Sequence, residues 1–70
     1  MKAFEVDEHV RLNQDLPERG LHRGQIGVVC STWLSPANCY EVEFENVGLG
    51  EPTRALLLES QLSAEVEHTL

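Results

Sequence analysis

Turn-forming residues recur at short intervals along this 70-residue chain and restrict what it can fold into. They are Pro17, Gly20, Gly24, Gly48, Gly50 and Pro52, together with the Pro36, Ala37, Asn38 stretch. The runs between them are too short for independent helices, whereas strands of a few residues fit them well. The spacing therefore predicts an all-β fold.

The segment "CYEVEFE", residues 39–45, shows the clearest strand pattern in the chain. Tyr40, Val42 and Phe44 alternate with polar residues, and alternate residues of a strand point to opposite faces. We therefore expect these three side chains in the core. The opposite face would carry Cys39, Glu41, Glu43 and Glu45.

Three further runs read as strands, at residues 9–13, 25–33 and 53–60, and a short last strand is expected at 64–66. Residues 59–62, "ESQL", suit a single 3₁₀ turn. An open sheet this small would expose both faces and its edges, so bending it into a barrel allows one face to form a core. We expect one domain over residues 1–70, with a core at about 6–66 and frayed ends.

The long first loop, residues 14–24, contains residues with specific backbone requirements. Pro17 fixes φ for a turn, and Gly20 supplies a conformation that other residues avoid. Gly24 permits the reversal into the second strand. Gly27 lies inside that strand and is interpreted as a bulge or a sharp bend.

These segments carry a resemblance. The order "DLPERGLHRGQIGVV", "YEVEF", "ALLL" and "SQL" resembles a family of small uncharacterised bacterial proteins, catalogued as a domain of unknown function with an SH3-like barrel. The resemblance covers residues 6–62. It implies a five-stranded SH3-like barrel with one 3₁₀ turn before the last strand.

The element "RGQIGVV" is also similar to the glycine turn of other SH3-like barrels. These include KOW-type ribosomal modules, the small barrel subunit on the stromal side of photosystem I, and the barrel parts of nitrile hydratase and its activator. What these barrels share is docking onto a larger partner, which the resemblance implies for this chain too.

Acidic residues outnumber basic ones by twelve to five, which gives a formal net charge of −7. The cations are scattered, at Lys2, Arg11, Arg19, Arg23 and Arg54. Such a chain repels phosphate backbones and anionic membranes, so nucleic acid and membrane are disfavoured as partners. A basic protein surface is the better complement.

Neither a secretory leader nor an apolar stretch of membrane-spanning length is recognisable, so we expect a cytoplasmic protein with reduced cysteines. Cys30 lies an even number of residues from Ile26 and Val28, so it shares their face of the strand and is expected in the core, whereas Cys39 should face solvent. Whether the two thiols lie close together stays open.

No catalytic or metal-binding constellation emerges from the sequence. The glycines lack the spacing of a phosphate-binding loop, and a strand follows them instead of a helix. His9, His22 and His68 lack metal-ligand spacing, and the cysteines form no C-x₂-C motif. We therefore expect no enzymatic activity, no cofactor and no metal.

The leading hypothesis is a protein-interaction module, either a monomer or a homodimer. Its candidate contacts are Trp33, Glu41, Glu43, Glu45, Arg19 and Arg23. Trp33 is equally compatible with the core and with an interface, and one spare Trp, even with Phe4, cannot build a proline-peptide groove. The alternatives are an accessory or regulatory subunit of an enzyme, the neutralising partner of a toxin, and a KOW-like module in which Arg19 and Arg23 contact phosphate.

Overall fold

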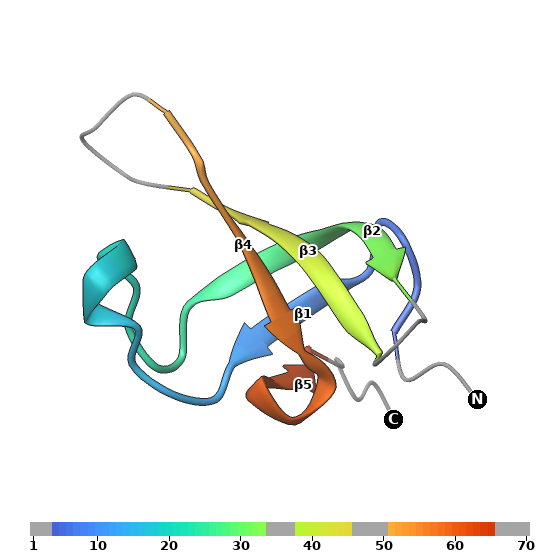
Figure 1. The fold of residues 1–70 in the computed structure, drawn as a ribbon, viewed down its shortest axis with the longest axis horizontal. Coiled ribbons are helices and arrows are strands. Elements are labelled where there is room, and N and C mark those ends of the chain that lie inside the picture. Colours follow the sequence, from blue (N-terminus) through green and yellow to red (C-terminus); the bar gives the residue numbers. More distant parts are fainter. Residues whose placement is uncertain (1–3, 34–37, 46–50, 66–70) are drawn as a thin grey trace, which may run out of the picture.

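The structure is a computed structural model that describes residues 4–33, 38–45 and 51–65 (Figure 1). Its elements are β1 (His9–Leu12), η1 (Pro17–Arg19), β2 (Ile26–Trp33), β3 (Cys39–Phe44), β4 (Thr53–Leu58), η2 (Glu59–Gln61) and β5 (Leu62–Ala64). All strand pairings are antiparallel, in the order β4-β3-β2-β1-β5. The predicted all-β fold is thereby confirmed, including the 3₁₀ turn before the last strand.

One continuous sheet contains the five strands, and its pairings leave β4 and β5 at the two edges. β4 runs directly into η2 and β5, which brings the last strand beside β1 (Figure 1). This return of the chain onto its first strand is compatible with an SH3-like barrel, although the pairings among the described residues do not close the sheet.

The last strand lies earlier in the chain than the sequence suggested. β5 begins at Leu62, not at the expected residue 64, and Leu62 pairs with Leu12 of β1. Leu62 is buried, so its apolar side chain draws the start of the strand into the core. The end of the expected strand, Val66, lies outside the described residues.

The core is formed by the inward faces of the strands and by residues from the segments that flank β1. Its buried members are Phe4, Val10, Leu12, Leu16, Leu21, Val29, Tyr40, Val42, Phe44, Ala55, Leu57 and Leu62. Tyr40, Val42 and Phe44 are fully buried, which confirms the alternation read from the sequence. Phe4 packs edge-on against Tyr40 with 5.2 Å between ring centroids, so it is unavailable to a surface groove.

The first loop is anchored to the core at both ends of its 3₁₀ turn. Leu16 and Leu21 form a bridge with backbone N···O distances of 2.9 and 3.1 Å, and both side chains are buried. Pro17 opens η1, and Gly20 ends it at a φ of +70°, as predicted from the sequence. Two leucines of an otherwise exposed loop therefore belong to the hydrophobic core.

Gly27 does not mark the bulge of β2, which lies between Val29 and Ser31. It faces inward, pairs with Phe44 in the sheet, and leaves the space that Val42 and the Phe44 ring occupy. The close approach of these two neighbouring side chains requires glycine here.

Candidate functional site

A β-bulge in β2 determines which face Trp33 occupies. Val29 pairs with Val42 and Ser31 pairs with Glu41, which leaves Cys30 as the extra residue between the two pairs. In a regular strand Trp33 would share the buried face of Val29, because the two are an even number of residues apart. The bulge reverses this parity, and Trp33 lies on the outer face with 56% of its surface exposed.

Trp33 borders a shallow groove on the outer face of β2, β3 and β4. The groove has a volume of about 220 Å³ and is lined by Trp33, Glu41, Arg54, Ala55 and Leu56. Leu56 is 59% exposed. An indole ring and a leucine side chain thus meet solvent within one groove that also carries a carboxylate and a guanidinium.

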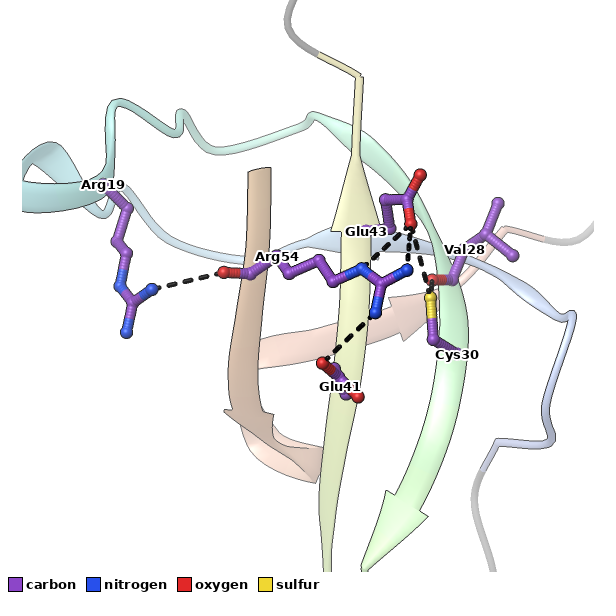
Figure 2. A network of polar contacts seen from close by, with 6 residues as sticks. All are labelled: Arg19, Val28, Cys30, Glu41, Glu43 and Arg54. Atoms are coloured by element: carbon purple, nitrogen blue, oxygen red, sulfur yellow. Dashed lines mark hydrogen bonds and ion pairs between the residues drawn. The ribbon is translucent and has the colours of Figure 1, made fainter. Parts of the chain in front are cut away.

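Arg54 joins the two half-buried glutamates of β3 into one ion cluster. Figure 2 shows the Arg54 side chain lying across β3 between Glu43 and Glu41. Its Nη2 and Nε each lie 3.1 Å from Oε1 of Glu43, whereas Nη1 is 3.7 Å from Oε2 of Glu41. The acidic face expected from the sequence is therefore partly neutralised by a cation from the neighbouring strand.

The remaining candidate residues lie away from the groove. Nη1 of Arg19 donates to the backbone carbonyl of Arg54 at 3.2 Å, which covers one end of the exposed edge of β4 (Figure 2). The backbone N–H of Arg23 donates to Oδ1 of Asp15 at 2.8 Å, within the first loop. Glu45 is exposed beyond the end of β3. Of the six candidates, only Trp33 and Glu41 line the groove, and Glu43 adjoins it through Arg54.

Cys30 is not a core residue, contrary to the expectation from its parity. The face it shares with Ile26 and Val28 is the outer one, because Gly27 and Val29 are the residues that point inward. Its Sγ lies 3.7 Å from the Val28 carbonyl oxygen and 3.8 Å from Oε1 of Glu43 (Figure 2).

Cys39 lies on the outer face, as predicted, and is half-buried. The sheet register pairs it with Trp33 on one side and with Leu58 on the other. Cys30 and Cys39 are therefore not cross-strand partners, and both are free thiols.

The family model described as "Domain of unknown function (DUF4926)" matches residues 4–62. The chain belongs to this family. No curated protein and no solved structure matches it. In the described parts of this family member, no helix is long and apolar enough to cross a membrane. No group of three or more His, Cys, Asp or Glu side chains suited to a metal ion occurs among the same residues.

The sequence analysis missed three residues of the groove, Arg54, Ala55 and Leu56. β4 reads "TRALLL", and three consecutive leucines hide the alternation that buries Leu57 and exposes Leu56. The pairing of Arg54 with Glu43 depends on the register of β3 and β4, which the sequence does not specify. The useful signal is Arg54, because a charged residue is expected on the outer face and Leu56, two residues further along the strand, shares that face.

Cys30 is expected to react slowly with alkylating reagents. Burial raises the pKa of its thiol, Glu43 and Glu41 raise it further, and the charge of Arg54 opposes them. Because the thiolate is the nucleophile, iodoacetamide should modify Cys30 more slowly at pH 8 than it modifies N-acetylcysteine amide, with the rate profile displaced to higher pH. The measurement uses the Cys39→Ser variant, in which Cys30 is the remaining thiol.

The same shift fixes the sign of a stability effect. The unfolded chain releases the thiol proton at a lower pH than the folded chain, so the free energy of unfolding should fall as the pH rises through the alkaline range. For the alkylation measurement, the urea-unfolded Cys39→Ser variant is the control and should react about as fast as N-acetylcysteine amide. A folded protein that reacts equally fast would show that the thiol is not shielded.

Proposed function

We propose that this protein is a non-enzymatic, cytoplasmic protein-binding module that docks onto a larger, basic partner. The docking surface is the groove between Trp33 and Leu56 on the outer face of β2, β3 and β4. The observation that carries the proposal is the exposure of these two large apolar side chains, 56% and 59%, in one groove.

The energetics of interfaces support this assignment. Small domains need their large apolar side chains for the core, because their surface-to-volume ratio is unfavourable. Here the only tryptophan of the chain lies outside the core, on the face to which a β-bulge directs it. Tryptophan is enriched among residues that dominate binding energy, and removal of such a residue costs 2 kcal/mol or more, which is a factor of about 30 in affinity.

The charge of the chain supports a basic partner. A net charge of −7 on 70 residues steers cationic surfaces toward the protein and disfavours phosphate. In the ion cluster at the groove, Glu41 and the adjoining Glu43 share the Arg54 guanidinium, so the net charge of the cluster is also negative.

The test is an affinity capture from a lysate of the source cell at moderate salt, with and without nuclease, using the wild-type chain and three variants. Trp33→Ala and Leu56→Ala alter the groove. Leu58→Ala is the matched control, because Leu58 is also an exposed leucine of β4 (47%) but does not line the groove.

The wild type and Leu58→Ala are expected to retain a stoichiometric, nuclease-resistant protein. Trp33→Ala should weaken the affinity about 30-fold and so reduce the recovery by up to that factor when the bait concentration is below the Kd, with a smaller reduction for Leu56→Ala. Equal recovery by Trp33→Ala and wild type would refute the docking surface. Recovery of nuclease-sensitive material alone would favour nucleic-acid binding through residues such as Arg19 and Arg23.

A further inference from the structure

The Glu41 carboxylate is under-partnered for a half-buried charge that lines a groove. Within residues 4–33, 38–45 and 51–65 it meets one cation, Arg54, at 3.7 Å, which is beyond hydrogen-bond distance. Arg54 instead makes its two close contacts to Glu43, at 3.1 Å. The Arg54 guanidinium thus compensates the charge of Glu43 more fully than that of Glu41, and the uncompensated negative charge lies at Glu41.

The Trp33 ring lies on that side. Trp33 pairs with Cys39, and Glu41 is the next residue of β3 that faces outward, so Trp33 and Glu41 are diagonal neighbours on adjacent strands. Such neighbours lie about 7–8 Å apart, a spacing that admits one planar group between the two side chains. An aromatic face attracts cations, and a carboxylate beside it adds an ion pair.

We infer that the groove receives one arginine side chain of the partner, stacked on Trp33 and paired with Glu41. This inference rests on the proposed function and specifies the chemistry of its anchor. Arginine fits better than lysine because its planar guanidinium both stacks on an indole and pairs with a carboxylate through two N–H groups. Its methylene stem covers the apolar wall that Leu56 provides.

The test titrates the full 70-residue chain with the tripeptide acetyl-Leu-Arg-Leu-amide and with its citrulline and lysine analogues. Trp33 is the sole tryptophan, so its fluorescence reports on the groove without a label, and amide NMR shifts locate the binding site. Citrulline has the shape of arginine without its charge. The arginine peptide is expected to bind at least about tenfold more tightly than the citrulline peptide, with lysine between them.

Two charge-matched variants separate a specific site from general attraction. Glu41→Gln should weaken arginine-peptide binding about tenfold, whereas Glu45→Gln removes the same charge from an exposed residue outside the groove and should leave binding nearly unchanged. Arg54→Gln removes the internal competitor for Glu41 and should tighten binding.

Four results would overturn the inference. The first is equal affinity for the arginine and citrulline peptides, and the second is an equal loss of affinity in Glu41→Gln and Glu45→Gln. The third is peptide-induced amide NMR shifts outside the groove. The fourth is Trp33 fluorescence that changes with protein concentration, because a second copy of the chain then occupies the groove. If the peptide shows no charge preference but Trp33→Ala still releases the captured partner, the anchor is apolar and the proposed function stands. If Trp33→Ala retains the partner, the proposed function itself fails.

Discussion

Replacement of Gly27 with alanine should lower the free energy of unfolding by about 2 kcal/mol. A Cβ atom at this position would lie 2.6 Å from Cγ1 of Val42 and 2.8 Å from Cδ1 and Cε1 of Phe44. Both neighbours are fully buried and held by the core, so neither can move away without displacing others. For a domain of this size the loss corresponds to a fall in melting temperature of about 10 °C or more.

Urea denaturation followed by far-UV circular dichroism measures this effect, and Gly20→Ala is the control. Gly20 also requires glycine, but only for its φ of +70°, and an added Cβ there meets no atom within 4 Å. Its replacement should lower the free energy of unfolding by about 1 kcal/mol through backbone strain alone.

A double-mutant experiment tests the clash itself. In the Gly27→Ala background, Val42→Ala should lower the free energy of unfolding less than it does in the wild type, because it removes one of the clashes. Additive losses would show that the clash does not limit stability.

The strand pattern of β3 was readable because one of its faces is entirely apolar and the other entirely polar or thiol-bearing. Tyr40, Val42 and Phe44 occupy the buried positions that their spacing predicted. Pro17 and Gly20 were equally informative, since each restricts the backbone in a way that few contexts tolerate. Where a residue has one strong requirement for burial or for backbone conformation, the sequence alone is sufficient to predict its position in the fold.

β2 was misread because its inward positions include a glycine. Gly27 contributes no side chain to the hydrophobic pattern, so Ile26 and Val28 gave the stronger apolar signal although they point outward. Cys30 was assigned to the core by the same parity. The bulge at Cys30 then shifts the alternation once more, and that shift is a property of the pairing with β3 that no local pattern records.

Only part of the candidate site could be predicted from the sequence, because the rest depends on the pairing of the strands. Trp33 and Glu41 were recognisable as residues with unusual chemistry, and they do line one groove. Arg54 and Leu56 come from a strand that pairs with β3 through a register set by the whole sheet. Neutralisation of the glutamates by Arg54 follows from that register, so the sequence suggested a more acidic face than the fold presents.

Truncation to alanine should lower the free energy of unfolding strongly at one leucine of the chain and hardly at another. Leu21 is fully buried at the end of the first loop, where it bridges to Leu16, and Leu21→Ala should lower the free energy of unfolding by about 3 kcal/mol. Leu56 is mostly exposed, and Leu56→Ala should change the free energy of unfolding by less than about 0.5 kcal/mol. Urea denaturation of both variants measures the contrast.

The contrast bears directly on the proposed docking surface. The stability of a 70-residue domain is about 4–10 kcal/mol, so the Leu21→Ala loss would leave about 1–7 kcal/mol and accelerate amide exchange throughout the first loop. A Leu56→Ala variant that folds as stably as the wild type but binds its partner less tightly would show that the fold does not need this leucine and that binding does. If Leu56→Ala is instead as destabilising as Leu21→Ala, the exposed leucine supports the sheet itself, and its position in the groove no longer argues for a partner.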